Sequence, residues 1–409
     1  MTAVSLPAKT SQTDLLEELQ KANALTAGGE SLVLQIPPQF FITADALAFL
    51  AAWGIREKRA GREIRFFGER SALGYLSRLD LFRYLQIDFK ESFERHPEDG
   101  RFIPIRLIEN AASVTGASNA ICDLVLAQFD NAREFLPAME WAVYEIVDNV
   151  RLHSSSESPG AVVAQYYAHR HRLDIAICDV GRGILASLSE SRKLWSHGDA
   201  ITQALMRGVT RDPEVGQGNG LAGSLEIVKV NRGSFQIWSG NAMFRLVDGE
   251  DKGFVSIPEV PGTGVIFRLD TRRPVDLGET FISNVSDAGW SYLNYAAGQV
   301  QERGAIRVAE RCANTGTREA AIPLRRKIQA LLPDMDAAVV LDFSGIERAS
   351  SSFLDELLGR LAASLGAKLF HERILVVCAP QQVADMATVV IRQRLEGVAS
   401  PDDEHERHE

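Results

Sequence analysis

Two breaks in the hydrophobic pattern divide this chain and limit the folds that it can adopt. The stretch 91–100 is acidic and contains both proline and glycine, and residues 271–274 read Thr-Arg-Arg-Pro. Segments of this kind join domains rather than form helices or strands. At 409 residues the chain is also too long for one ordinary domain. We therefore predict domains at residues 1–98, 99–272 and 273–397, and a disordered acidic tail at 398–409.

The charge balance and the apolar pattern exclude two classes of protein. Lys and Arg number 44 against 54 Asp and Glu, so the net charge is −10, and no long basic run is present. Binding to nucleic acid through its phosphates therefore has no electrostatic basis. The longest nearly unbroken apolar stretch, Ala46–Ile55, is far shorter than the roughly 20 residues that span a bilayer. The N-terminus lacks the pattern of a secretion signal, so we expect a cytoplasmic protein without membrane binding.

The cysteines support the same compartment. They are far apart and form no CxxC pair, as their positions show: Cys122, Cys178, Cys312 and Cys378. This spacing fits neither a disulfide framework nor a zinc site. We predict buried thiols in a reducing environment.

The first and last domains have the same alternation of elements. After a polar leader, residues 31–37 and 63–67 have the pattern of strands, and helices are predicted from Thr43 and over 71–85. In the last domain, strands at 305–309, 337–343 and 374–379 alternate with helices at 317–332 and 351–365. Both domains are therefore predicted to be small α/β modules.

The central domain has a different order. Its first strand, 102–107, is followed by a long helical pattern over 118–153 and then by strands at 161–168 and 172–178. A helix at 221–230 precedes strands at 234–238, 243–247 and 265–269. Long helices followed by mostly consecutive strands predict an α+β sandwich, with one sheet faced by helices, and not a doubly wound fold.

Polar residues recur on one face of the long central helix. Glu145, Asn149 and His153 are spaced by four, which places them above one another. A polar stripe on an exposed helix explains such spacing, and so does a binding site. We interpret His153 as a hydrogen-bond donor on this face, and His169, His171 and His197 as surface or lid residues.

A carboxylate and two glycines follow the strand at 172–178. In Asp179-Val-Gly181-Arg-Gly183, the glycines allow the backbone to approach a flat ligand, and the carboxylate can accept a hydrogen bond from an exocyclic amine. The same string also forms an ordinary turn.

A second glycine-rich segment precedes the helix at 221–230. Gly216, Gly218 and Gly220 free backbone N–H groups near a helix N-terminus, where a phosphate is favoured. The string GNGLAG matches GxGxxG, but no strand precedes it, which argues against a dinucleotide fold. No GxxxxGK[ST] motif occurs, which excludes the P-loop class.

Together with Thr263, which lies between two glycines before a strand, these motifs resemble those of the GHKL ATPase superfamily. The resemblance covers about residues 100–272 and is strongest to the anti-sigma-factor kinase type. It implies a Bergerat-type α/β sandwich that binds ATP and Mg²⁺. It implies the following roles: Asn149 holds Mg²⁺, Asp179 binds the adenine amine, Gly181 and Gly183 shape the adenine pocket, Gly216, Gly218 and Gly220 form the lid, and Thr263 supports the nucleotide.

Glu145 is the candidate catalytic residue. A carboxylate one turn from the Mg²⁺ ligand can take a proton from water, which gives an ATPase, or from a serine hydroxyl, which gives a kinase. No phosphoacceptor-histidine helix precedes the domain, and no Lys-bearing transducer domain follows it. Both departures argue against an ordinary sensor kinase and against the gyrase and MutL branch.

The last domain resembles the STAS fold of anti-sigma-factor antagonists over about residues 280–395. The resemblance rests on Asp342 at a strand end and on the triple serine that opens an apolar helix. It implies that Ser351 or Ser352 is a phosphoacceptor, although Ser350 stands where the usual Asp would be and Phe353 where a glycine would be, as in a STAS-like variant. Simple helix capping by serine is the alternative. The first domain is a possible degenerate member.

We therefore expect a GHKL domain between STAS-like modules that uses its nucleotide state to control a regulatory protein partner. Self-association into a homo-oligomer is also expected. The alternatives are a dimerising ATPase of a stress or defence assembly and a non-catalytic ATP sensor.

Overall fold

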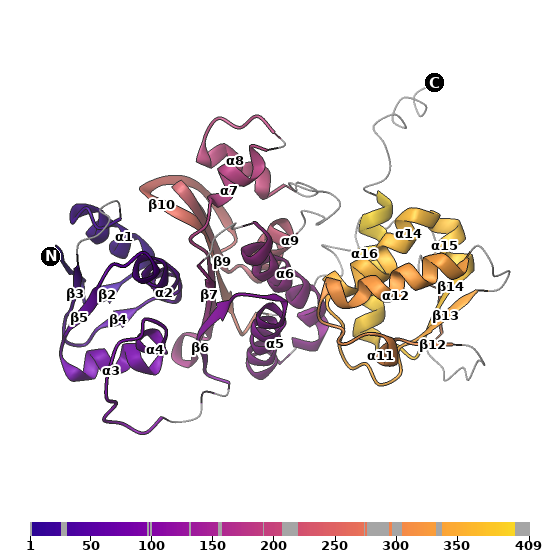
Figure 1. The fold of residues 1–409 in the computed structure, drawn as a ribbon, viewed down its shortest axis with the longest axis horizontal. Coiled ribbons are helices and arrows are strands. Elements are labelled where there is room, and N and C mark those ends of the chain that lie inside the picture. Colours follow the sequence, from indigo (N-terminus) through magenta and orange to yellow (C-terminus); the bar gives the residue numbers. More distant parts are fainter. Residues whose placement is uncertain are drawn as a thin grey trace. The chain divides into compact units, whose positions relative to one another are not determined.

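The computed structural model describes most of the chain. The described residues are 2–25, 31–95, 98, 100–130, 132–153, 158–190, 192–206, 220–273, 275, 294–296, 305–332 and 338–396. They fall into two compact units, one formed by Met1–Leu136 with Glu145–Asp276 and the other by Pro137–Tyr144 with Leu277–Glu409. Figure 1 traces their elements in chain order. The predicted tail at 398–409 lies outside the described residues.

The N-terminal module of the first unit is an α/β layer, as the sequence predicts. It contains β1 (Thr2–Ser5), β2 (Lys9–Thr10), α1 (Gln12–Lys21), β3 (Leu32–Ile36), β4 (Phe41–Ile42), α2 (Ala44–Arg59), β5 (Ile64–Gly68), α3 (Arg70–Arg78) and α4 (Leu81–Tyr84). Strands β1, β3 and β5 form a parallel sheet in that order.

Two predictions for this module are corrected by the structure. Residues before 25 are not a mere polar leader, because β1 and α1 fold there and Ser11 forms a capping box with Asp14 at the start of α1. The single helix expected over 71–85 is interrupted at Asp80, whose φ of 63° is left-handed and ends the helical turn.

The remaining elements of the first unit build an antiparallel sheet. They are β6 (Phe102–Ile108), α5 (Ala111–Gln128), α6 (Ala132–His153), β7 (Gly160–Tyr167), η1 (Ala168–Arg170), β8 (Arg172–Cys178), α7 (Gly183–Leu188), α8 (His197–Ala204), α9 (Gly220–Asn231), β9 (Ser234–Val247) and β10 (Glu250–Asp270). The strand order is β6-β7-β8-β10-β9, and every neighbouring pair is antiparallel.

The local sequence pattern predicted where these elements lie but not how long they are. The long helix predicted over 118–153 is two helices, α5 and α6, which are separated near Phe129. The strands expected at 234–238 and 243–247 are one strand, β9. Its partner β10 is much longer than the predicted strand at 265–269, and register shifts between Ser256 and Thr263 accommodate irregular pairing.

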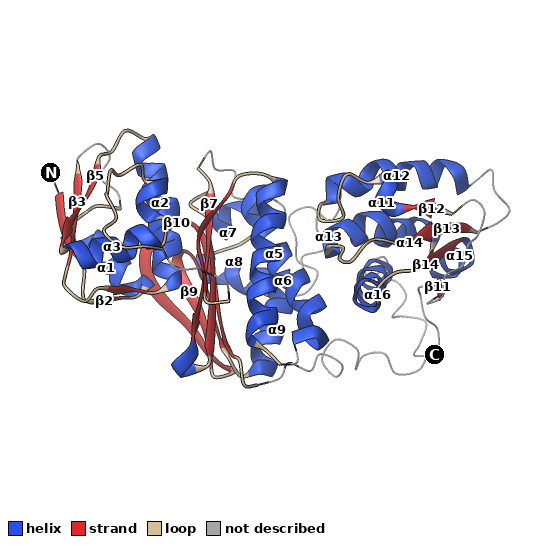
Figure 2. Cartoon of the chain, turned by 90° about the horizontal axis from the view of Figure 1, so that it is seen from below, coloured by secondary structure: helices blue, strands red, loops and turns tan. Residues whose placement is uncertain are grey.

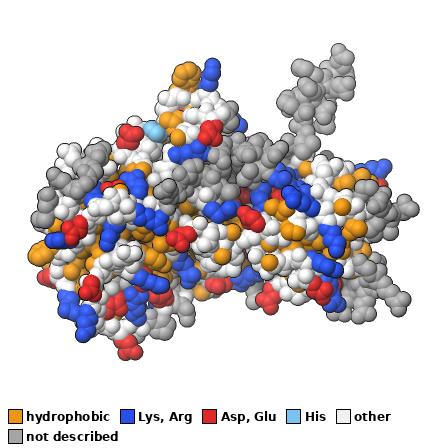
Figure 3. Space-filling view, viewed as in Figure 1, with side chains coloured by type: hydrophobic (Ala, Val, Ile, Leu, Met, Phe, Trp, Pro, Cys, Tyr) orange, Lys and Arg blue, Asp and Glu red, His pale blue; other side chains and the backbone are white. Residues whose placement is uncertain are grey.

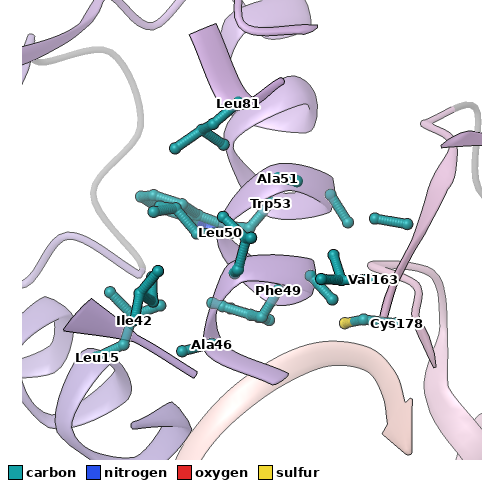
Figure 4. Close-up of a cluster of buried hydrophobic side chains, with 14 of the residues drawn as sticks. Leu15, Ile42, Ala46, Phe49, Leu50, Ala51, Trp53, Leu81, Val163 and Cys178 are labelled. Carbon is teal, nitrogen blue, oxygen red and sulfur yellow. The ribbon is translucent and has the colours of Figure 1, made fainter. Parts of the chain in front are cut away.

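Both faces of the antiparallel sheet are covered, although the sequence predicted helices on one face only. Figure 2 shows α5, α6 and α9 on one side of the strands and α2 on the other. Every residue of α2 from Ala44 to Ile55 is buried. Figure 4 shows part of the buried cluster, which extends from α2, with Phe49 and Trp53, to Val163 of β7 and Cys178 of β8. The N-terminal module and the sheet therefore share one hydrophobic core.

A buried charge network accompanies this apolar contact. Arg268 of β10 donates to Asp45 of α2 at 3.1 Å, and its Nε lies 3.7 Å from Asp174 of β8. Arg172 pairs with the same carboxylate at 2.7 Å. Burial raises the pKa of Asp174 to about 6, against the opposing effect of both arginines. Charges buried in this way are stable only while they stay paired.

The second unit contains a parallel sheet in the order β11-β14-β13-β12. Its elements are β11 (Asn294–Ala296), β12 (Ile306–Arg307), α11 (Val308–Arg311), α12 (Arg318–Leu331), β13 (Val339–Asp342), α13 (Ser351–Leu354), the π-helical turn η3 (Asp355–Gly359), α14 (Arg360–Leu365), α15 (Ala367–Arg373), β14 (Ile374–Val377) and α16 (Gln381–Glu396). The predicted alternation of strand and helix is present, and α15 and α16 are additional to it.

The structure bears on two further predictions, which concern membrane-spanning helices and the burial of the cysteines. Within the described residues, no helix has the length and apolar character needed to cross a membrane. All four cysteines are free thiols, but only Cys122 and Cys178 are buried, whereas Cys312 and Cys378 are partly exposed.

Candidate functional site

The candidate site lies where β8 ends against β10. Cys178 pairs with Gly264, and the next residue, Asp179, donates its backbone N–H to the carbonyl of Thr263 at 2.8 Å. Antiparallel pairing thus joins two motifs that are more than eighty residues apart in sequence. We call Asp179, Gly181, Gly183, Ser239 and Thr263 the Asp179 site.

Asp179 is buried without a charged partner among the interactions that the structure describes. Its side chain is enclosed, with 7% of the residue exposed, and Oδ1 accepts a hydrogen bond from Gly181 N at 2.8 Å. Desolvation raises the pKa of this carboxyl to about 7, although backbone N–H groups of Gly181 and Thr263 favour the charged form. A buried carboxyl whose pKa is shifted in this way is a candidate for a binding site.

Ser239 of β9 fastens the turn, and the sequence analysis did not identify it. Its Oγ accepts from Ile184 N at 2.9 Å and donates to Gly262 O at 2.9 Å. Thr263 Oγ1 lies 3.3 Å away and donates to it. The signal in the sequence is weak: a small polar residue between Trp238 and Gly240, in a strand that contains other polar residues as well.

The glycines permit a close backbone approach that a side chain would prevent. Gly183 and Gly262 have φ values of +75° and +78°. A Cβ on Gly183 would lie 2.8 Å from Ser239 Oγ, and one on Gly262 would lie 2.1 Å from the carbonyl oxygen of Asp179. The sequence predicts that Gly183 shapes the site. In the structure, a larger residue at this position would collide with Ser239, so a glycine is required there.

The end of α6 comes to the same edge of the sheet. A Cβ on Gly160 would lie 2.2 Å from Val150 Cγ1 and 2.9 Å from the carbonyl oxygen of Cys178. Val150 follows Asn149, and Cys178 precedes Asp179, so the backbone at Asn149 and the backbone at Asp179 lie near the same edge of the sheet. Glu145, one turn earlier, and Asn149 are both half-buried.

The remaining predicted residues of this site are only partly described. Gly216 and Gly218 lie outside the described residues, Gly220 begins α9, and the side chain of His153 is not described. His169 and His171 are exposed, as expected for surface residues. His197 is half-buried and packs on β9, because a Cβ on Gly240 would lie 2.2 Å from its ring.

Exposed hydrophobic side chains surround α8. Trp195, just before the helix, is 87% exposed, and Met206 and Phe254 are also exposed. A Cβ on Gly198 would lie 3.7 Å from Phe254, so that residue is adjacent to the helix. Figure 3 shows hydrophobic side chains at the surface of this segment.

In the second unit, the serine loop has the geometry of a helix cap. Ser350 Oγ accepts from Phe353 N at 3.1 Å, which is the capping arrangement that the sequence left open. Ser352 is only 1% exposed, so its hydroxyl is not accessible in this conformation. Asp342, at the end of β13, accepts from both the backbone and the hydroxyl of Ser344, at 2.8 and 2.6 Å. Of the two predicted acceptors, Ser351 is the one that we retain.

Comparison with known proteins identifies one part of the chain. Residues 320–383 match the family described as a STAS-like domain of unknown function (DUF4325). The match runs from α12 into α16, so this chain contains a STAS-like domain within its second unit. No curated protein matches the chain.

Proposed function

We propose that the first unit binds Mg²⁺-ATP at the Asp179 site and that the chain uses its nucleotide state to control a protein partner. The observation that carries this proposal is a buried, chargeable carboxyl at a glycine-lined strand end. The proposal includes the GHKL-type sandwich that the sequence motifs resemble.

Three features of the Asp179 site support adenine binding. Its carboxyl oxygens have backbone donors as partners and retain acceptor capacity for an exocyclic amine. The close approach of Gly183 and Gly262 to their neighbours leaves backbone, and no bulky side chain, at the turn. The hydrogen bonds of Ser239 with Ile184 and Gly262 hold the turn after β8 and the Gly262 turn of β10 in one arrangement.

The metal and phosphates would be held at the other end of the nucleotide. The Asn149 amide oxygen would bind Mg²⁺, which commonly takes few protein ligands and several phosphate oxygens. Gly216, Gly218 and Gly220 would supply backbone N–H groups to the phosphates.

Glu145 is the proposed general base of either reaction. It would accept a proton from water in ATP hydrolysis or from a serine hydroxyl in phosphoryl transfer. The STAS-like domain supports the second reaction, because Ser351 begins a helix, where added negative charge is tolerated by the helix dipole. We propose a regulatory protein as the partner, and self-association as a second consequence of nucleotide binding.

Calorimetry with ATP tests the binding proposal. We expect saturable, Mg²⁺-dependent ATP binding that weakens at least about tenfold in Asp179→Asn, because one hydrogen bond to a charged group is lost. Asp174→Asn is the matched control: this carboxyl is also buried on β8 but is paired with Arg172 and lies near Asp45 on α2. Equal ATP affinity in both variants and the wild type, or no binding at all, would refute the proposal.

γ-Labelled ATP distinguishes the two reactions. Label bound to the protein that disappears in Ser351→Ala, and also in Glu145→Gln, supports a serine kinase acting on its own chain. Release of phosphate that depends on Glu145, without bound label, supports an ATPase. Label that persists in the double variant Ser351→Ala, Ser352→Ala excludes both internal acceptors.

A further inference from the structure

A second concave region lies in the first unit, away from the Asp179 site. It is a cavity of about 470 Å³ between the last turns of α2, the short helix α4 and strand β6. We call it the α2–α4 cavity. Its lining residues are Ile55, Lys58, Arg59, Arg83, Tyr84, Leu85, Gln86 and Leu107. This volume is within the range of small-molecule sites.

The charges around the cavity are unbalanced. Three of its lining residues are cationic and none is acidic, in a chain whose net charge is −10. Two acidic side chains lie near these cations: Glu109 is 4.0 Å from Arg59, and Asp80 is 3.9 Å from Arg83. Asp80 is already bound by Arg95 at 2.8 Å. The charged side chains that line the cavity itself are all basic, which favours an anionic ligand there.

Aromatic and aliphatic surface lies beside these cations. The guanidinium of Arg83 is 5.6 Å from the centroid of the Tyr84 ring. Burial raises the pKa of Tyr84; Arg83 and Arg106 act in the opposite direction, and Asp80 and Glu109 reinforce the rise, so charges of both signs lie near its hydroxyl. Ile55, Leu85 and Leu107 supply apolar lining. A ligand in this cavity would contact both the cationic side chains and the apolar lining residues.

The helix dipole of α2 explains only part of this arrangement. Cations in the last turn of a helix are stabilised by its C-terminal carbonyls, which accounts for Lys58 and Arg59. It does not account for Arg83 and Tyr84, which belong to α4, or for the contribution of β6 to the wall. Lys58 is held in place by a hydrogen bond to the carbonyl of Leu85 in the segment after α4, so the cations of α2 and the residues of α4 form one structure.

We propose that the α2–α4 cavity binds a small organic anion that carries an aromatic ring, with a phosphate or similar group at Arg59 and Arg83 and the ring against Tyr84 and the apolar wall. This site is separate from the nucleotide site of the proposed function. Its occupant contacts both the N-terminal module and edge strand β6 of the antiparallel sheet.

Phenyl phosphate is the probe that tests this site, by ligand-observed NMR with the full chain at low salt. We expect saturable binding with a Kd of about 1 mM or tighter. The affinity should fall at least about tenfold in the double variant Arg59→Glu, Arg83→Glu. These side chains are 50% and 73% exposed, so the fold should tolerate their replacement.

The matched control is Arg65→Glu on β5, whose side chain is 62% exposed and pairs with Glu63 outside the cavity. It should bind phenyl phosphate like the wild type, and all three proteins should bind ATP equally. Equal phenyl phosphate binding in the double variant, no saturable binding, or inorganic phosphate binding as tightly as phenyl phosphate would overturn the proposal. A loss of ATP binding in Asp179→Asn leaves the cavity result unchanged, so the two proposals fail separately.

Discussion

At the scale of single residues, the Asp179 carboxyl shows how an environment prepares a side chain for ligand binding. Its only described partners are backbone N–H groups, and desolvation raises its pKa from 3.8 to about 7. The native state therefore binds a proton more tightly than the unfolded chain does. Near neutral pH, the ligand-free protein bears a cost for keeping this group ionised.

We predict that Asp179→Asn stabilises the ligand-free protein at pH 8. Because the native pKa is raised, the stability of the wild type falls as pH rises from about 4 to about 7, and an amide removes this dependence. The expected gain at pH 8 is up to about 4 kcal/mol, declining toward zero near pH 4. Chemical denaturation across this pH range measures it. Asp270→Asn should behave oppositely, since hydrogen bonding to Arg272 lowers the pKa of Asp270. A variant less stable than the wild type at pH 8 contradicts the prediction.

Two features require a glycine at position 262: its positive φ and the close approach of the Asp179 backbone. Their energetic costs can be tested separately by experiment. Gly262 and Gly253 both lie in β10 with positive φ, but a Cβ on Gly253 would meet nothing within 4 Å. We predict that Gly253→Ala costs about 1 kcal/mol, from backbone strain alone. Gly262→Ala should cost at least about 3 kcal/mol, because the backbone of Asp179 must move. Urea denaturation compares them, and similar costs would refute the role of the contact.

At the scale of elements, η3 concentrates buried charge within the STAS-like domain. Asp355 and Glu356 are both buried. Arg394 of α16 binds Asp355 through two hydrogen bonds of 2.7 Å, and Arg325 of α12 binds Glu356 at 2.9 Å. A Cβ on Gly359 would lie 2.7 Å from Asp355 Oδ1, so a glycine is needed at that point of the turn. The widened turn thus places two carboxylates against arginines from flanking helices.

Removing one side chain of this ion-pair network should lower the stability of the domain. We predict that Arg394→Met destabilises the domain by about 3 kcal/mol, because Asp355 keeps a buried charge with fewer partners. Arg307→Met is the control: its pair with Glu310 is largely exposed, and the cost should stay below about 0.5 kcal/mol. Thermal denaturation followed by circular dichroism measures both. A small effect of Arg394→Met would mean that neighbouring arginines compensate.

At the scale of the whole molecule, the described chain has two compact units although its sequence predicts three domains. The predicted boundary near 272 lies close to the division at Asp276. The stretch 91–100 instead joins two parts of one unit, because α2 packs on β7, β8 and β10 and shares their core. A segment of linker composition does not require that the parts it joins be independent.

Deletion of residues 1–98 tests this shared core. We predict that the shortened protein aggregates or remains unfolded, because one apolar face of the antiparallel sheet loses α2. In the intact chain, hydrogen exchange should show β3 and β8 losing protection in one cooperative step. A soluble, folded fragment starting at residue 99, with exchange like that of the intact chain, would contradict the prediction.

The sequence predicted the positions of most helices and strands. Apolar periodicity and turn residues are local, and they located β3, β5, β8 and α9 and placed Asp179 at a strand end. Element ends were less accurate, as at Asp80 and between α5 and α6, because a break in a helix depends on what the adjoining surfaces pack against.

What the sequence by itself determined is therefore local: element type, the spacing of Glu145 and Asn149 on one helix face, and the STAS-like pattern of the last domain. Only the tertiary structure decided that β8 pairs with β10, that Ser239 fastens the Asp179 turn, and that α2 covers the sheet. These features join residues far apart in the chain, such as Asp45 and Arg268, which are 223 positions apart. Such contacts follow from complementary surfaces and paired charges, which no local pattern specifies.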